Sequence, residues 1–186
     1  HTLQSKGHPM PNETPLILRD CREDDLPTIV EIYADAVING TASFELTAPD
    51  LAEMAARRAR LVDDGYPYIV AERAGVVLGY AYAGAYRARP AYGATVENSI
   101  YISPAAKGQG VGKALLALLI REAEARNYRQ MIAVIGDSNN QASRALHESL
   151  GFEFVGILRS VGWKHGRWLD SVLMQRMLGE GDTTPR

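Results

Sequence analysis

Several features are scarce in this sequence, and each scarcity excludes a class of protein. Cys21 is the only cysteine, so the chain has no internal disulfide, which is typical of proteins in a reducing compartment. Lysine and arginine total 20 against 22 aspartate and glutamate, and this net charge of −2 offers no basic footprint for nucleic acid. No apolar run approaches the roughly 20 residues that span a bilayer. We therefore expect a cytoplasmic protein that binds neither nucleic acid nor membrane, with Cys21 as a small buried hydrophobe.

The remaining composition is that of an ordinary globular protein. Of the 186 residues, 46% are hydrophobic and 23% are charged, which predicts one domain with a substantial core. Residues 1–9 are expected to be an expression remnant, with Met10 as the native start. The domain is expected to span 10–178, followed by a loose tail at 179–186.

The stretch from Thr95 to Leu119 contains the clearest structural signal. Residues 95–102 alternate in polarity and are rich in β-branched and aromatic side chains, which predicts a strand that ends at Pro104. A glycine loop follows at 107–112, and apolar residues then recur at helical spacing from Val111. Glycines let an anion approach the backbone, and a helix that begins there directs its free N–H groups at the anion. The arrangement predicts a phosphate cradle.

Two common nucleotide-binding loops are excluded by particular residues. A P-loop would need glycine where Lys107 stands and a hydroxyl-bearing residue where Ala114 stands. A dinucleotide-binding loop would need its third glycine at Lys113. The cradle must therefore belong to another family.

The rest of the chain alternates strand and helix patterns. Helices are predicted from 24 to 39, from a capping-box-like start at 47–50 to 64, from 111 onward, and from 137 to 150. Strands are predicted at 16–20, 66–73, 76–87, 95–102, 130–135, 152–161 and 168–177. The continuous apolar run at 130–135 predicts a strand buried on both faces. The order β-α-α-β-β-β-α-β-α-β-β predicts a mixed sheet with helices on both faces.

The glycine loop resembles the pyrophosphate loop of the GNAT acetyltransferases, [QR]-x-x-G-x-[GA]. It reads Lys-Gly-Gln-Gly-Val-Gly at 107–112, with Lys107 in place of arginine or glutamine. The order of elements from Leu16 to Leu178 is also similar to that family. The resemblance implies the α/β (α+β) GNAT acyl-CoA N-acyltransferase fold, in which a mixed central sheet of about seven strands is flanked by about four helices. It also implies acetyl-CoA as co-substrate and no metal.

Six runs narrow the resemblance to one branch. They read TASFELTAP, YAYAGAYRARPAY, TVENSIYISP, AVIG, ALHESLGF and WKHGRWLD, and they look like the phosphinothricin and methionine sulfoximine N-acetyltransferases. That branch implies transfer of acetyl from acetyl-CoA to the α-amino group of a small amino-acid-like acceptor. It also implies antibiotic or herbicide resistance, and a homodimer with active sites near the subunit contact.

The chemistry requires a group that removes a proton from the acceptor ammonium. Glu97 lies on the predicted central strand, and in the branch the glutamate of V-E-x-S is the proposed general base. His147 stands where many GNAT enzymes carry a tyrosine that protonates the departing thiolate. A histidine there is able to relay protons in either direction, or simply to be satisfied at a helix surface.

The resemblance also assigns binding residues. Residues expected to contact acetyl-CoA are Ile100, Tyr101, Ile102, Lys107, Gly108, Gln109, Gly110, Val111, Gly112, Lys113, Asn140 and Ser143, with backbone N–H groups near Tyr101 and Ile102 stabilising the oxyanion. Residues expected to contact the acceptor are Phe44, Arg87, Arg89, Tyr92, Glu97, Asn98 and Ser99. Of these, Arg87 or Arg89 would hold the acceptor carboxylate.

Two other functions stay open at this point. One is a GNAT enzyme that acetylates protein N-termini or lysines. The other is a non-catalytic sensor that binds acyl-CoA through the cradle alone. The presence of both Glu97 and His147 favours catalysis over sensing.

Overall fold

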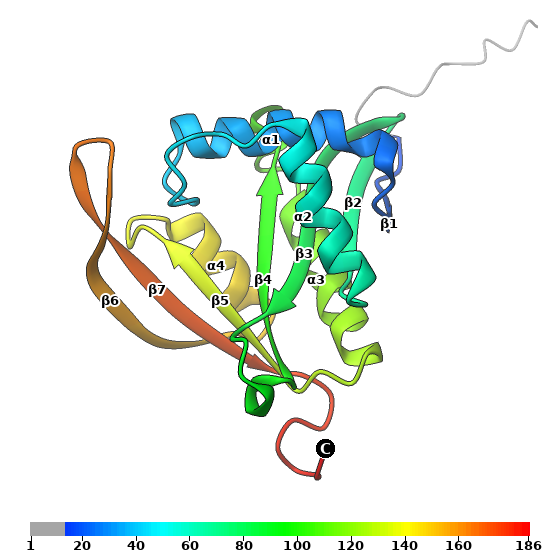
Figure 1. The fold of residues 1–186 in the computed structure, drawn as a ribbon, viewed down its shortest axis with the longest axis vertical. Helices are drawn as coiled ribbons and strands as arrows, with labels where there is room; N and C mark the ends of the chain where they lie inside the picture. Colours follow the sequence, from blue (N-terminus) through cyan, green and yellow to red (C-terminus); the bar gives the residue numbers. More distant parts are fainter. Residues whose placement is uncertain (1–13) are drawn as a thin grey trace, which may run out of the picture.

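The structure, a computed structural model, describes residues 14–186, so the expected remnant at 1–9 and the start at Met10 lie outside the described residues. Within that range seven strands form one sheet in the order β1-β2-β3-β4-β5-β7-β6 (Figure 1). The strands are β1 (Ile17–Asp20), β2 (Tyr68–Arg73), β3 (Val76–Ala85), β4 (Thr95–Ile102), β5 (Gln130–Gly136), β6 (Glu153–Lys164) and β7 (Arg167–Met177). The helices are α1 (Leu26–Asn39), α2 (Leu51–Asp63), α3 (Val111–Ala125) and α4 (Gln141–Ser149).

Helices cover both faces of the sheet, as the sequence predicted. Helices α1 and α2 pack on the face that carries a row of tyrosines, with Ile29, Tyr33 and Met54 in that core. Helix α3 packs on the opposite face through Leu115, Leu116 and Leu119, and α4 lies on the same side (Figure 1). In the part of the chain that the structure describes, no helix is long and apolar enough to cross a membrane.

Two local predictions are wrong. Helix α2 begins at Leu51, and its cap is Asp50, whose carboxylate accepts the N–H of Glu53 at 2.8 Å. Thr47 and Asp50 have the same spacing as Asp50 and Glu53, so the sequence pattern placed the cap three residues early. Strand β5 is buried on one face only, because Val134 on its other face is 40% exposed.

The junction between β4 and β5 determines where the site forms. It is the only parallel pair in the described sheet, and it consists of Thr95 with Gln130, Val96 with Met131 and Glu97 with Ile132. Beyond Glu97 the two strands separate, while β5 stays paired with β7 as far as Gly136. The sheet therefore opens into a wedge toward the C-terminal ends of β4 and β5.

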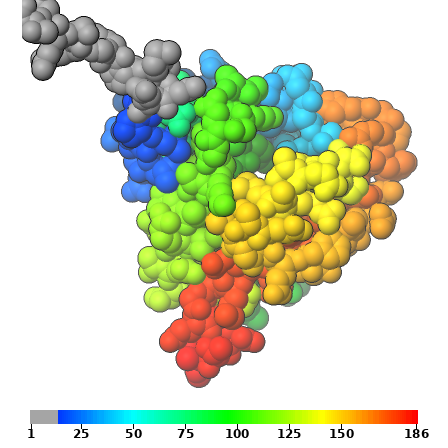
Figure 2. All heavy atoms as spheres, turned by 180° about the vertical axis from the view of Figure 1, so that it is seen from behind, coloured from blue at the N-terminus to red at the C-terminus, as the bar shows by residue number. Residues whose placement is uncertain are grey.

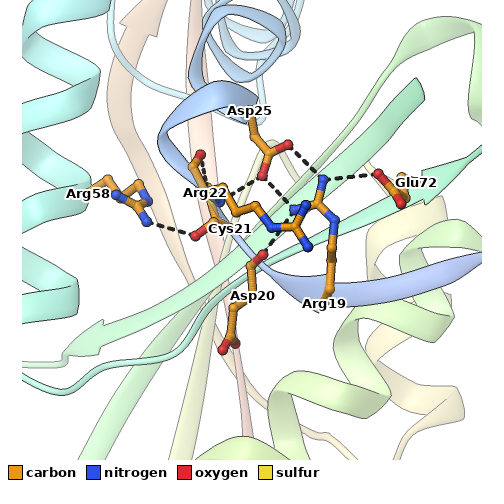
Figure 3. Close-up of polar contacts among 7 residues, drawn as sticks. All are labelled: Arg19, Asp20, Cys21, Arg22, Asp25, Arg58 and Glu72. Carbon is orange, nitrogen blue, oxygen red and sulfur yellow. Dashed lines mark hydrogen bonds and ion pairs between the residues drawn. The ribbon is translucent and has the colours of Figure 1, made fainter. Parts of the chain in front are cut away.

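An ion-pair network fixes the start of α1 far from this wedge (Figure 3). The Arg19 guanidinium contacts both carboxylate oxygens of Asp25, at 2.7 and 2.8 Å, and Glu72 at 3.0 Å. This pairing lowers the pKa of Asp25. Arg58 of α2 donates to the carbonyl of Cys21 at 2.7 Å. Cys21 is buried, as predicted, and burial raises the pKa of its thiol to about 11.

Candidate active site

A cavity of about 1070 Å³ follows the wedge from the glycine loop to the loop after α1. Figure 2 looks onto this face, where green residues near the glycine loop, the light-blue loop after α1 and yellow α4 surround a hollow. The predicted site residues that line the cavity are Phe44, Glu97, Asn98, Ser99, Ile100, Tyr101, Ile102, Lys107, Gly108, Gly110, Val111, Gly112, Lys113, Asn140, Ser143 and His147. Gln109, Arg87, Arg89 and Tyr92 are not among the lining residues.

The glycine loop leaves an open cradle at the start of α3. Gly108 and Gly110 have φ of 76° and 80°, a left-handed backbone that side chains rarely adopt, and Gly110 is the N-cap of α3. No side chain caps this N-terminus, so its first N–H groups are available to a ligand. Lys107 and Lys113 line the same end of the cavity. Backbone donors, the helix dipole and two cations together suit a pyrophosphate.

Gln109 supports the cradle from outside. Its side-chain amide donates to the carbonyl of Ala105 at 3.0 Å, and its oxygen accepts from Arg73 at 3.0 Å. The side chain is thus turned away from the cavity, and the predicted ligand contact is left to its backbone.

The wall formed by β4 presents backbone groups to the wedge in a fixed alternation. Ser103 N–H bonds Leu78 at 2.8 Å and Tyr86 N–H bonds Thr95 at 3.4 Å, so the odd-numbered residues of β4 turn their N–H and C=O groups toward β3. Asn98, Ile100 and Ile102 therefore turn theirs toward the wedge. Ile102 agrees with the predicted oxyanion donor, whereas the N–H of Tyr101 faces β3 and only its side chain remains on the cavity side.

Glu97 stands at the vertex of the wedge, on the sheet face that α1 and α2 cover. Within residues 14–186 its carboxylate makes no hydrogen bond or ion pair, and burial raises its pKa. The arginine partner that a purely structural strand carboxylate would need is absent from that range. A desolvated carboxylate with a raised pKa is suited to accept a proton near neutral pH.

His147 lies on the opposite face of the sheet from Glu97, and it is only 4% exposed. Its Nδ1 is 2.7 Å from the carbonyl oxygen of Ser143, and its Nε2 is 3.2 Å from the side-chain oxygen of Asn98. A carbonyl only accepts, so Nδ1 carries a proton. Burial lowers the pKa of His147, which favours the neutral ring, with Nε2 as an acceptor.

A neutral His147 fixes the orientation of the Asn98 amide. If the Asn98 side-chain oxygen faces Nε2, two acceptors face each other and no hydrogen bond forms between them. In that orientation the buried Nδ2 of Asn98 has no partner in the described chain. Rotating the amide by half a turn lets Nδ2 donate to Nε2 and removes the conflict between two acceptors, while Oδ1 takes the buried position that has no partner in the described chain. We therefore assign Asn98 as the donor in this pair.

Helix α4 contributes the adjoining wall. Asn140 is its N-cap, and its side-chain oxygen accepts the N–H of Ser143 at 3.2 Å. Both residues line the cavity, as predicted, but the oxygen of Asn140 is occupied by capping and only its amide nitrogen is free to bind a ligand.

The end of the cavity near α1 was largely missed by the sequence prediction, which placed only Phe44 there. The further polar lining residues at this end are Asp35, Asn39, Thr41, Ser43 and Glu45. The Glu45 carboxylate pairs with Arg57 of α2 at 2.6 Å, so the carboxylates that favour a cationic ligand such as an ammonium group are those of Asp35 and Glu97. The run TASFELTAP was a usable signal for Thr41, Ser43 and Glu45, whereas Asp35 and Asn39 sit in an ordinary helical pattern.

The predicted carboxylate-binding arginines lie elsewhere. Arg87 is exposed, with its guanidinium 5.1 Å from the centre of the Tyr86 ring. Tyr92 packs edge-on against the same ring and is 40% exposed. Arg89 is also exposed. The cavity of a single chain therefore has no arginine along its wall.

Comparisons with known proteins agree with this geometry. A family profile described as "Acetyltransferase (GNAT) domain" matches residues 18–173. A phosphinothricin N-acetyltransferase of Alcaligenes faecalis is 57% identical over 167 residues, which cover 90% of this chain and 85% of that protein. An L-methionine sulfoximine/L-methionine sulfone acetyltransferase of Pseudomonas aeruginosa is 43% identical over 169 residues, which cover 90% of this chain and 98% of that protein.

A solved structure is also similar. The phosphinothricin acetyltransferase of the GNAT superfamily from Sinorhizobium meliloti, in complex with AcCoA, superposes with a TM-score of 0.89. It is 51% identical, and the match covers 91% of this chain and 92% of that chain.

Proposed function

This chain belongs to the GNAT acetyltransferase family, and on that premise we propose that it moves acetyl from acetyl-CoA to the α-amino group of a small amino-acid-like acceptor. Acceptors of the phosphinothricin, methionine sulfoximine or methionine sulfone type are proposed because the relatives carry those names. The observation that carries the proposal is the unpaired Glu97 at the vertex of the wedge. It stands between a phosphate cradle at one end and a carboxylate-rich wall at the other.

The described residues fit acetyl-CoA. The N–H groups of 108–113, with Lys107 and Lys113, would hold the pyrophosphate. The wedge-facing backbone of Ile100 and Ile102 would pair with the pantetheine arm in place of the missing strand partner. The same N–H groups are the candidates for oxyanion stabilisation.

Glu97 is proposed as the general base. It removes a proton from the acceptor ammonium, directly or through a water, and the free nitrogen then attacks the thioester carbonyl carbon. The new C–N bond forms, the C–S bond breaks, and CoA departs as the thiolate, which takes up, directly or through water, the second proton that the nitrogen loses on becoming the neutral amide. Asp35 is placed to favour the cationic amine before its proton is lost.

His147 is proposed as a positioning residue and not as the proton donor to the thiolate. Its one proton is committed to the carbonyl of Ser143, and its other ring nitrogen faces Asn98. It also stands on the opposite sheet face from Glu97, so the two residues act on different parts of the cavity.

A homodimer is proposed on the basis of an exposed apolar surface on β6 and β7. It comprises Phe154, Trp163 and Trp168, which share one face of the hairpin and are 51%, 56% and 61% exposed, and the two tryptophan rings pack edge-on at 5.1 Å. Exposed aromatic side chains gathered on one face often mark an interface. Light scattering of Trp168→Glu tests it: we expect a dimer for the parent chain and a monomer for the variant, and a monomeric parent would refute it.

The proposed setting is the cytoplasm, since the single buried cysteine suits a reducing compartment. Acetylation removes the positive charge of the acceptor amine, so resistance to amino-acid toxins that need this charge is the proposed biological outcome. Arg87 and Arg89 are retained as proposed carboxylate ligands, presented across a subunit contact.

The test is thiol release from acetyl-CoA with phosphinothricin, methionine sulfoximine and methionine sulfone, in parallel with peptides that carry free N-termini or lysines. Turnover on any of the three amino acids, with none on peptides, supports the proposal. Turnover on peptides alone would replace it with the protein-directed activity. Binding of acetyl-CoA without any turnover would identify a sensor.

A further inference from the structure

Two segments that are far apart in the sequence meet at the acceptor end of the cavity. One is the loop after α1, residues 40–46, and the other is the tip of the β6–β7 hairpin, residues 162–168. They lie side by side in both views, as light blue or cyan beside orange (Figures 1 and 2). Each overlaps one of the six runs that marked the branch, yet neither run has a role in the mechanism described above apart from the cavity wall.

The closest polar contact between them involves a buried lysine. The Lys164 ammonium donates to the carbonyl oxygen of Ser43 at 2.7 Å, across 121 residues of sequence, and Lys164 is only 3% exposed. No carboxylate within the described range lies at ion-pair distance from it. Burial lowers the pKa of Lys164, and the nearby Glu45 opposes this only in part.

A buried ammonium with a single carbonyl partner is a costly choice for stability alone. Desolvating the charge opposes folding, and well-packed apolar side chains usually perform as well or better at such positions. The position of Lys164 is therefore better explained by what it holds in place.

Ser43 is the residue that Lys164 holds, and it connects three elements. Its hydroxyl lies 2.9 Å from the Tyr33 hydroxyl of α1 and also accepts the N–H of Glu45 at 3.2 Å. Ser43 is 5% exposed, so all of these contacts are shielded from water. The neighbours Phe44 and Glu45 both line the cavity.

Phe44 fits between two strand glycines. A Cβ added at Gly162 would lie 2.6 Å from the Phe44 ring, and a Cβ at Gly136 would lie 2.8 Å from it. These distances are below any normal contact, so the ring can occupy this position only because both residues are glycine. The wall formed by Phe44 is thus set by β5 and β6, not by its own loop.

Three further contacts secure the loop, and one of them is the ion pair of Glu45 with Arg57 of α2 at 2.6 Å. The Asp137 carboxylate accepts from Thr41 at 3.0 Å and from Arg167 at 2.6 Å, so it joins the loop to the hairpin. His165 lies 3.1 Å from the carbonyl oxygen of Gly40. Lys164 is the only one of the hairpin's polar groups in these contacts that is buried.

We propose that Lys164 is a positioning residue that fixes Ser43, Phe44 and Glu45 as the acceptor wall, and that it thereby sets which acceptor side chains the enzyme accepts. The inference rests on the proposed amino-acid acetyltransferase function. Lys164 does not line the cavity, so we expect its removal to change selectivity among acceptors and not cofactor binding.

The test compares Lys164→Met, which keeps the stem and removes the ammonium, with Lys164→Arg and with Arg159→Met. Arg159 is on the same strand, its side chain is 75% exposed, and it serves as the matched control. For Lys164→Met we expect the ratio of kcat/KM between the best and worst of the three acceptors to change about tenfold, with the KM for acetyl-CoA within about twofold. Lys164→Arg should recover part of the change, and Arg159→Met should show none.

A second readout does not depend on turnover. Hydrogen exchange at the Glu45 amide should accelerate in Lys164→Met, while amides of α3 keep their protection. An equal loss for all acceptors, or unchanged exchange at 43–45, would overturn the proposal.

Two remaining outcomes are also decisive. If the parent enzyme acetylates none of the three acceptors, the proposed function fails, and the exchange measurement still decides whether Lys164 holds the loop. If Lys164→Met does not bind acetyl-CoA, Tyr33→Phe releases Ser43 from the other side. An unchanged acceptor ratio in Tyr33→Phe would then overturn the proposal, and a changed ratio would support it.

Discussion

At the end of the cavity near α3, the groups that face the interior are mostly backbone, whereas at the end near α1 they are mostly side chains. The phosphate cradle comes from one continuous stretch, 107–113, in which glycine conformation and a helix start provide the donors. The acceptor end combines α1, the loop 40–46, β4 and the β6–β7 hairpin. One end is thus specified by local sequence, and the other depends on contacts between distant segments.

The difference has a functional meaning. All acyl-CoA substrates share the same pyrophosphate, so a cradle of backbone N–H groups serves without adjustment. Acceptors differ in their side chains, so the wall that meets them is built from side chains that substitution alters. Variants at the two ends should therefore separate cofactor affinity from acceptor turnover.

The largest expected effect is at the vertex between the two ends. Glu97→Gln should lower kcat by roughly 10²-fold or more, because the amine loses its general base, while acetyl-CoA affinity is unchanged. Steady-state kinetics and calorimetric titration with acetyl-CoA measure the two quantities. Glu153→Gln, an exposed strand glutamate on β6, is the control. Unchanged turnover in Glu97→Gln would remove Glu97 from the role of base.

The next effect is at the cradle. Gly110→Ala should weaken acetyl-CoA binding roughly tenfold, because a non-glycine residue at φ 80° costs about 1–2 kcal/mol and the loop relaxes away from that geometry. Gly75→Ala is a matched control, since Gly75 has φ 78° in a hairpin turn, and neither added Cβ meets an atom within 4 Å. Both variants should lose similar stability. Equal acetyl-CoA affinity in the two variants would contradict a role for Gly110 in the cradle.

A smaller effect is expected for His147, which belongs to neither end. His147→Gln retains an acceptor for the Asn98 amide, so kcat should fall only about threefold, the scale of one imperfect hydrogen bond. His147→Leu leaves that amide unpaired, so its kcat should be lower than that of His147→Gln. The pair of variants is read by kcat at saturating acceptor and acetyl-CoA. Losses of about 10²-fold in both would instead identify His147 as a proton donor.

How far the sequence alone could predict these two ends follows from the range of the contacts. The cradle, α3 and the order of strands were predicted because alternation, helical spacing and glycine position are local signals. Ser43 and Lys164 both lie in runs that mark the branch, but no local signal predicts the contact between them, since it spans 121 residues. Gln109 was assigned to the ligand because its neighbours were, and only the positions of Arg73 and Ala105 show that its side chain turns outward.

The smallest expected effect concerns stability. Burial raises the pKa of Glu97 above its ordinary 4.5, so the folded chain binds this proton more tightly than the unfolded chain does. As pH rises from the ordinary pKa of Glu97 to its folded pKa, the free energy of unfolding falls. This loss of stability is complete above the folded pKa. Glu97→Gln should therefore have a higher Tm than the parent at pH 7.5, with the difference vanishing as pH falls below 4.5.

Thermal denaturation at several pH values measures this difference, with Glu153→Gln again as control. A higher Tm together with lower kcat would mean that the vertex trades stability for reactivity. A Tm for Glu97→Gln that is lower than the parent's at pH 7.5 would show that the carboxylate has a stabilising partner.

The short β4–β5 junction has a further consequence for how the molecule holds together. Only three residue pairs join the four strands on one side to the three on the other, so the sheet has a crease along its middle. The two units on either side of this crease are joined mainly by the buried core, which crosses it through Val96, Met131 and Met174. A ligand whose arm lies along the crease bonds to both units, and its binding energy adds to the coupling between them. We therefore expect the bound ligand to couple the two sides of the sheet, so that they unfold together more than they do without it.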